Sequence, residues 1–241
     1  MKDFLGVVGG IGPLATTYFM KKVINFTSAV NDQDHINMMV LNHAEIPDRT
    51  SYILDKTNSN PYPYLLEDCL MLQEAGAKLI AIPCNTSHYF LPELKQKVKV
   101  PIIDMQKETA KALKELKLQK VGVMATSGTV ATGLFQNALR AEGIDCFLPP
   151  NSVQSKIMDI IYSNIKAGVM PSRAEFNQVS NYFWQNDCEA IILGCTELSM
   201  LKEIFELKDN FVDALDIAVS FVVSFFNKQK SEEKNTLNFL I

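Results

Sequence analysis

The sequence lacks long hydrophobic runs, a strong charge of either sign and any regular spacing of cysteine. No uninterrupted apolar stretch reaches the length of about 20 residues that a membrane-spanning helix needs, so no membrane anchor is expected. The most apolar late segment, 211–226, carries Asp213 and Asp216 on an amphipathic pattern and is expected to face the core. The net charge of −4 and the absence of a basic cluster argue against a nucleic-acid partner.

The five cysteines are an odd number without the spacing of a disulfide framework, which suits a reducing compartment such as the cytoplasm. Neither a Cys-x-x-Cys nor a Cys-x-x-His pair is present, so no zinc site is expected. Residues 1–3 lead directly into an apolar strand, and no cleavable leader is expected. The content of 47% hydrophobic and 21% charged residues is typical of a soluble globular protein.

Apolar segments of strand length alternate with segments of helical periodicity, which predicts an α/β fold. The expected strands cover residues 4–8, 36–42, 78–82, 100–103, 120–124, 145–148 and 190–193. The expected helices cover residues 14–29, 64–75, 92–97, 107–116, 130–141, 154–166, 173–186 and 211–227. A charged tail at 228–235 is expected to be solvated.

The second half of the chain repeats the first. The strand, glycine turn and helix at 4–29 recur at 120–141, and Cys84 recurs in order as Cys195. Any two strand–turn–helix units look alike, but the repetition of both features in one order favours a duplicated unit. We expect two similar domains, each a mostly parallel sheet flanked by helices, related by a pseudo-two-fold axis, with the active site in the interdomain cleft. The expected boundaries are 1–103 plus 211–241 for the first domain and 104–210 for the second.

Two of the cysteines each follow an expected strand: Cys84 ends the run Ile80-Ala81-Ile82-Pro83, and Cys195 ends the run Ile191-Ile192-Leu193-Gly194. Ligands of open α/β sheets bind beyond the carboxyl ends of the strands. A thiol at that place also lies near a helix N-terminus, whose unpaired N–H groups favour thiolate. A buried inert thiol is the alternative for each residue. The remaining cysteines are most simply small hydrophobic residues: Cys69, Cys146 and Cys188.

Two thiols on opposite faces of one carbon suit the inversion of a stereocentre, because one side chain removes a proton while the other returns it. An ordinary thiol pKa of roughly 8.5 needs only modest lowering to supply thiolate at neutral pH. Hydrogen-bond donors to the substrate carboxylate would stabilise the developing carbanion. Residues at the expected strand ends could supply them: Gly10, Asn85, Thr126 and Thr196.

At these motifs the chain resembles the aspartate/glutamate racemase family, and more closely its aspartate racemase branch. The matching motifs are Gly9-Gly10-Ile11-Gly12-Pro13-Leu14-Ala15-Thr16, Pro83-Cys84-Asn85-Thr86 and Gly194-Cys195-Thr196-Glu197. The resemblance implies a homodimeric two-domain enzyme that interconverts L- and D-aspartate, or glutamate, between Cys84 and Cys195, without pyridoxal phosphate, metal or other cofactor. Glutamate racemases usually show Asp-Ser-Gly after the first strand and His after the second Cys-Thr. Here Gly9-Gly10-Ile11-Gly12 follows the first strand and Glu197 follows the second Cys-Thr, which favours the aspartate branch.

The resemblance also implies the substrate contacts. Arg49 would bind the side-chain carboxylate of the substrate, and Lys166 would be a second cationic contact from the other domain. Thr86 and Glu197 lie within the matching motifs, and Glu197 would either assist Cys195 or cap its helix. Without the resemblance, Arg49 and Lys166 would be taken for solvated surface charges.

His43 and His88 are tempting as bases, and His88 follows Cys84 by one helical turn. The favoured interpretation of both is a satisfied or surface histidine. Two other functions remain open: a dicarboxylate isomerase or decarboxylase of the same superfamily, and a non-catalytic amino-acid-binding homologue. The presence of both Cys84 and Cys195 favours the racemase over the first of these, because the related enzymes often keep only one such cysteine.

Overall fold

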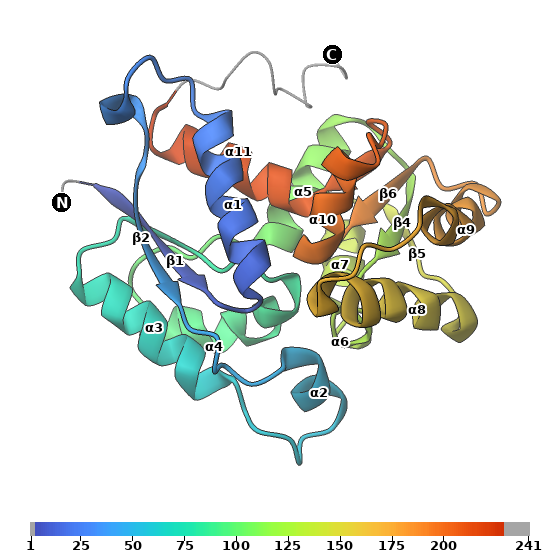
Figure 1. Ribbon diagram of the computed structural model, residues 1–241, viewed down its shortest axis with the longest axis horizontal. Helices are drawn as coiled ribbons and strands as arrows, with labels where there is room; N and C mark the ends of the chain where they lie inside the picture. Colours follow the sequence, from blue (N-terminus) through green and yellow to red (C-terminus); the bar gives the residue numbers. More distant parts are fainter. Residues whose placement is uncertain (1–2, 229–241) are drawn as a thin grey trace. The chain divides into compact units, whose positions relative to one another are not determined.

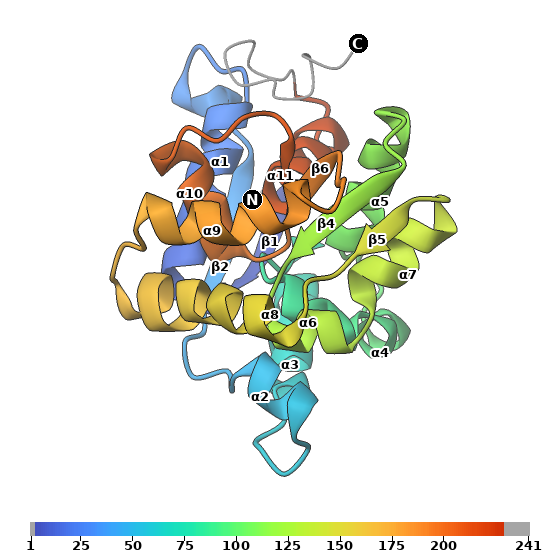
Figure 2. The same ribbon diagram turned by 90° about the vertical axis from the view of Figure 1, so that its right-hand side faces the viewer.

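The computed structural model describes residues 3–228, which fall into two compact units. Unit 1 comprises residues 3–105 and 215–228, and unit 2 comprises Gln106–Ala214 (Figures 1 and 2). The chain thus leaves unit 1 for unit 2 and returns to unit 1 with its last described helix. Within the described residues no helix is both long and apolar enough to cross a membrane. The charged tail predicted at 228–235 lies outside the described residues from position 229 onward.

The sheet of unit 1 is parallel, with strand order β2-β1-β3. Its strands are β1 (Phe4–Gly9), β2 (Asn37–Asn42) and β3 (Leu79–Ala81). The strand predicted at 100–103 is reduced to one parallel bridge between Ile80 and Ile102. Pro101 has no N–H to contribute, and the backbone N–H groups of Lys99 and Val100 donate to the Gln73 side chain instead of to a neighbouring strand.

Helices of unit 1 include one that the sequence did not predict. They are α1 (Pro13–Phe26), α2 (Arg49–Leu54), α3 (Tyr62–Glu74), α4 (Leu91–Lys97) and α11 (Ala214–Phe225), with short 3-10 turns η1 (Asp32–Asp34) and η2 (Asn85–Phe90). The short α2 begins because Asp48 caps it, accepting the Ser51 N–H at 2.8 Å. α11 is attached to α1 by a buried ion pair of 2.8 Å between Lys22 and Asp216.

Unit 2 repeats this topology with strand order β5-β4-β6-β7, again all parallel. The strands are β4 (Lys120–Met124), β5 (Asp145–Phe147), β6 (Ala190–Leu193) and β7 (Phe211–Asp213). In both units the first strand is central, the second lies on one side and the third on the other. This shared order supports the duplication inferred from sequence. Because 211–213 pair as β7, they belong to unit 2 and not to the long final helix that the sequence suggested.

Two predicted helices of unit 2 are interrupted. The helices are α5 (Met105–Glu115), α6 (Ser127–Ala131), α7 (Leu134–Ala141), α8 (Asn151–Met158), α9 (Arg173–Trp184) and α10 (Thr196–Ile204). Gly133, with φ of +69°, separates α6 from α7 within the predicted helix 130–141. The predicted helix 154–166 continues from α8 into a π-helix, η3 (Asp159–Asn164), and a 3-10 turn, η4 (Ile165–Ala167). Segments of π-helix occur frequently at functional sites.

The repeated glycines Gly6 and Gly122 let a helix approach each central strand. A Cβ on Gly6 would lie 3.1 Å from Leu72 of α3, and one on Gly122 would overlap the buried ring of Phe183 on α9. The same residue type at the same place in β1 and β4 therefore serves the same packing need.

Replacing Gly122 with alanine is expected to destabilise the protein by about 1–3 kcal/mol, because the Phe183 ring must shift in a filled core. Gly6→Ala is expected to cost less, since its neighbours need to move by only a few tenths of an ångström. Urea unfolding of both variants measures the difference. Equal stability of the two would contradict this account of the packing.

Candidate active site

Cys84 lies beyond the carboxyl end of β3 and is the N-cap residue of η2. It is 8% exposed, and its carbonyl oxygen accepts the Ser87 N–H at 3.1 Å. The two residues that follow it, Asn85 and Thr86, are buried within η2. The sequence motif therefore places a thiol beyond a strand end, followed by two buried polar residues.

His88 holds the backbone of Cys84 in place. Its Nδ1 lies 3.0 Å from the Cys84 carbonyl oxygen and its Nε2 lies 3.1 Å from the Ile103 carbonyl oxygen. Burial lowers the pKa of His88, so the ring is neutral at pH 7 and donates its single N–H to one of these two carbonyls. His88 is thus a buried core histidine with one of its two ring nitrogens hydrogen-bonded, close to the favoured interpretation from sequence.

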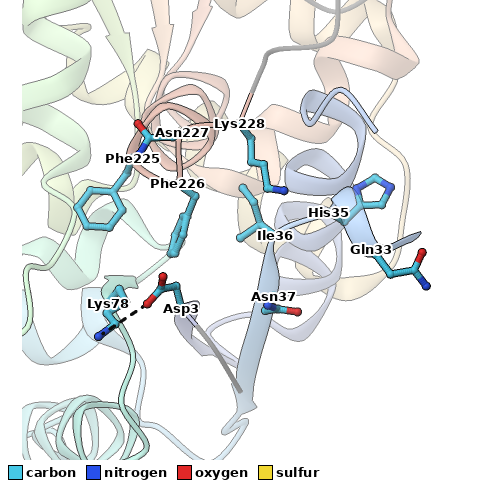
Figure 3. A pocket seen from close by; sticks show the side chains of 10 residues that line it. All are labelled: Asp3, Gln33, His35, Ile36, Asn37, Lys78, Phe225, Phe226, Asn227 and Lys228. Atoms are coloured by element: carbon cyan, nitrogen blue, oxygen red, sulfur yellow. Dashed lines mark ion pairs between the residues drawn. The ribbon is translucent and has the colours of Figure 1, made fainter. Parts of the chain in front are cut away.

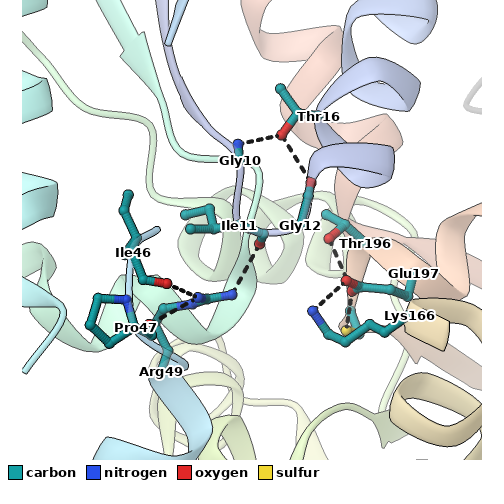
Figure 4. A network of polar contacts seen from close by, with 11 residues as sticks. Gly10, Ile11, Gly12, Thr16, Ile46, Pro47, Arg49, Lys166, Thr196 and Glu197 are labelled. Carbon is teal, nitrogen blue, oxygen red and sulfur yellow. Dashed lines mark hydrogen bonds and ion pairs between the residues drawn. The ribbon is translucent and has the colours of Figure 1, made fainter. Parts of the chain in front are cut away.

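Cys195 occupies the equivalent place in unit 2, beyond the carboxyl end of β6 and at the N-cap of α10. Its Sγ donates a hydrogen bond of 2.9 Å to Oε2 of Glu197, which also accepts the Thr196 hydroxyl at 3.3 Å. The other carboxylate oxygen of Glu197 lies 2.8 Å from the ammonium of Lys166 (Figure 4). A thiol, a carboxylate and an ammonium group are therefore connected in series within unit 2.

The charge of Glu197 is set by two opposing effects. Burial raises its pKa, while the Lys166 ammonium and the hydrogen bond from the Cys195 thiol lower it, and the balance lies below the ordinary value. The carboxylate is therefore ionised at neutral pH beside the thiol of Cys195. Lys166 reaches it from η4, whose C-cap residue is Gly168 with φ of +76°. The contact of Lys166 with substrate stays a prediction.

Arg49 is 6% exposed, at the start of α2 in unit 1. Its guanidinium donates to three backbone carbonyls, those of Ile46 at 3.3 Å, Pro47 at 3.0 Å and Ile11 at 3.2 Å (Figure 4). Arg49 thereby joins the loop that precedes α2 to the glycine turn that follows β1. Its role in binding a substrate carboxylate stays a prediction.

The glycine turn after β1 is closed by Thr16, which the sequence analysis noted only as part of a motif. The Gly10 N–H donates to Oγ1 of Thr16 at 2.9 Å, and that hydroxyl donates to the Gly12 carbonyl at 3.0 Å. The equivalent turn after β4 is closed by Thr126, whose hydroxyl oxygen accepts the Thr129 N–H at 3.2 Å. Both predicted donors, Gly10 and Thr126, thus serve their own turns here, and their contact with substrate stays a prediction.

The surroundings of the other three cysteines favour the protonated thiol. Burial raises the pKa of the Cys69 and Cys146 thiols to about 12 and also raises that of Cys188. They behave as small hydrophobic residues, as the sequence analysis expected. All five cysteines are free thiols. Within residues 3–228 no cluster of three or more His, Cys, Asp or Glu side chains could hold a metal ion.

A cavity of about 510 Å³ lies elsewhere in unit 1 (Figure 3). Its lining includes Asp3, Asn37 and Lys78, which stand at the amino ends of the three strands. Cys84 follows the opposite, carboxyl end of β3. This cavity is therefore separate from the candidate active site.

The structure also shows polar contacts near these elements that sequence reasoning missed. Asp68 of α3 is buried and lies 3.0 Å from Nδ1 of His43, and its position within an apolar helical pattern gave no sign of this pair. Asp48 as a helix cap could have been found, because Asp is one of the residues preferred at the N-cap position.

Both thiols lie beyond the carboxyl ends of parallel strands, where open α/β sheets bind their ligands. Residues 8–222 match the Asp/Glu/Hydantoin racemase family, and the chain belongs to that family. It is an amino-acid racemase in class, hence an isomerase.

Individual relatives agree with this assignment. The chain is 24% identical over 223 residues to the broad specificity amino-acid racemase RacX of Bacillus subtilis, covering 87% of this chain and 92% of that protein. It is 28% identical over 178 residues to the glutamate racemase of Aquifex pyrophilus, covering 72% of this chain and 67% of that protein. The structure of the Picrophilus torridus aspartate racemase matches with a TM-score of 0.83 and 25% identity, over 98% and 99% of the two chains.

Proposed function

We propose that this protein interconverts L- and D-aspartate, with glutamate as a second substrate, by proton transfer between Cys84 and Cys195. It acts without pyridoxal phosphate or metal, as a cytoplasmic homodimer. The observation that carries the proposal is the equivalence of the two thiols, each at the N-cap of the segment that follows the third strand of its unit. Such matched placement is unexpected for thiols with no shared task.

In the proposed chemistry each cysteine acts on one face of the substrate Cα, one as thiolate and the other as thiol. In one direction the thiolate of the first cysteine removes the Cα proton, and the thiol of the second delivers a proton to the opposite face, so the two exchange protonation states. The reverse reaction uses them in the opposite order. The hydrogen bond from Cys195 to Glu197 supports a role for that carboxylate in holding the Cys195 proton between turnovers.

Aspartate is favoured over other amino acids by the cationic side chains and by one relative. A dicarboxylic substrate brings two negative groups, which Arg49 and Lys166 would bind in competition with their present partners on the chain. The similarity to the Picrophilus torridus aspartate racemase supports the same substrate. The broad specificity of the RacX relative argues for testing a panel of amino acids.

Racemisation in heavy water tests the proposal. The purified enzyme, without added cofactor and in the presence of a chelator, is expected to place deuterium at Cα of aspartate and to form the opposite enantiomer. Chirality-resolved chromatography with mass spectrometry measures both, across a panel of amino acids. Absence of deuterium from every amino acid would leave a non-catalytic binding protein as the surviving interpretation.

A further inference from the structure

The backbone of His43 is packed against the glycine turn of unit 1. His43 directly follows β2, and its N–H donates to the Gly9 carbonyl at 3.3 Å. Gly10 has φ of +85°, and a Cβ on it would overlap backbone atoms of His43. A displacement of the chain at His43 therefore displaces the glycine turn with it.

The side chain of His43 is bound to a second element. Its Nδ1 lies 3.0 and 3.1 Å from the two carboxylate oxygens of Asp68 on α3, and its ring meets that of Tyr64 edge-on at 5.7 Å. Asp68 is 3% exposed, and this burial raises its pKa. The neighbouring Glu67 raises the pKa further, while the hydrogen bond and the charge of His43 lower it, and the balance lies above the ordinary value. His43 is thus the group that compensates a buried carboxyl, and Asp68 fixes the direction of the imidazole.

The loop from His43 to Arg49 has a second attachment at its far end. The Arg49 guanidinium binds the Ile11 carbonyl of the glycine turn and the Ile46 and Pro47 carbonyls of the loop itself. The loop is closed internally by a bond of 3.4 Å from the Ile46 N–H to the His43 carbonyl. Both ends of the loop therefore contact one turn, and the His43 side chain adds a polar attachment to α3 beside the buried side chain of Ile46.

We propose that His43 and Asp68 form an anchor that positions the Arg49 loop and the glycine turn as one body, so that His43 is a positioning residue for substrate binding. The part concerning substrate rests on the proposed function, in which Arg49 binds a substrate carboxylate. The anchor itself rests only on the contacts within unit 1.

Hydrogen–deuterium exchange of the full-length protein tests the anchor without reference to activity. In His43→Leu the exchange of the segment 43–54 is expected to rise about ten-fold or more, because the loop loses its attachment to α3. His43→Asn, whose amide N–H can replace Nδ1–H toward Asp68, is expected to restore protection. If His43→Leu fails to fold, the double variant His43→Leu/Asp68→Leu, which leaves no unpaired buried acid, decides instead. Unchanged exchange in the folded variant would overturn the anchor.

Kinetics test the consequence for binding. In His43→Leu, KM for aspartate is expected to rise about ten-fold or more, with kcat changed far less, and Arg49→Leu is expected to reproduce this pattern. Lys78→Met is the control, because it removes an exposed ion pair of unit 1, that with Asp3, and is expected to leave KM and the exchange of 43–54 within about two-fold. Faster exchange with an unchanged KM would overturn the positioning role.

A wild-type protein that racemises no amino acid would refute the proposed function, while the exchange result would still decide the anchor.

Discussion

Replacing Cys84 or Cys195 with alanine is expected to abolish racemisation of aspartate in both directions. Each thiol supplies the proton-transfer group for one face, and removal of a positioned acid or base typically lowers a rate by about 10²–10⁴-fold. Loss of one thiol also leaves its partner with no acid to complete the inversion. Full racemase activity in either variant would contradict the two-thiol scheme.

A finer outcome distinguishes loss of one thiol from general damage. Each alanine variant is expected to exchange the Cα proton of a single enantiomer with heavy water and to return deuterium to the same face, without inversion. The two variants should differ in the enantiomer that they label. Cys146→Ala is the matched control, since this thiol is free, has a pKa raised by burial and lies on β5, and it is expected to racemise aspartate at the wild-type rate.

Replacing Lys166 with methionine is expected to have the second largest effect, because it leaves the carboxylate of Glu197 buried without its cation. The Glu197 side chain is 7% exposed. Breaking a buried ion pair costs about 3–5 kcal/mol, and the lower value applies here because the Lys166 side chain is 23% exposed. Lys114→Met is the matched control in the same unit, since its pair with Glu142 has a similar distance of 2.9 Å but an ammonium that is 61% exposed. That variant is expected to lose at most about 1 kcal/mol.

The pH dependence of stability should change sign between wild type and Lys166→Met. In the wild type the pKa of Glu197 is lower folded than unfolded, so its contribution is present above the unfolded pKa and is lost as pH falls through the folded value. Without the ammonium, burial is expected to bring the folded pKa above the unfolded one. The variant should then lose stability as pH rises from the unfolded pKa toward the new folded value. Urea unfolding at several pH values measures this, and parallel curves for the two proteins would contradict it.

Much of the fold follows from local sequence pattern. Strands β1 to β6 were predicted because buried parallel strands are continuous apolar runs, whereas β7 was placed in the final helix. The π-helix before Lys166 was not predicted, since its six residues are too few for a sequence pattern to separate it from an α-helix.

The two cysteines could be located at strand ends from sequence, because each follows an apolar run directly. The partners of the charged groups could not. Lys166 and Glu197 are 31 positions apart, and His43 and Asp68 are 25 apart. Both pairs are therefore set by tertiary packing, which the local periodicity of the sequence does not predict. Arg49 was predicted to be a substrate contact by the resemblance and a surface charge without it, whereas the structure buries it with its donors on backbone carbonyls.

The return of the chain through α11 has a consequence for synthesis on the ribosome. Domains generally fold as units as the nascent chain emerges, and unit 2 has its last strand once residue 213 has left the exit tunnel. Unit 1 must wait for α11, whose Leu215, Val219 and Val222 are fully buried and whose Asp216 neutralises Lys22. The half of the protein that is translated first is therefore the half that is completed last, and until then Lys22 lacks the carboxylate that α11 brings to it.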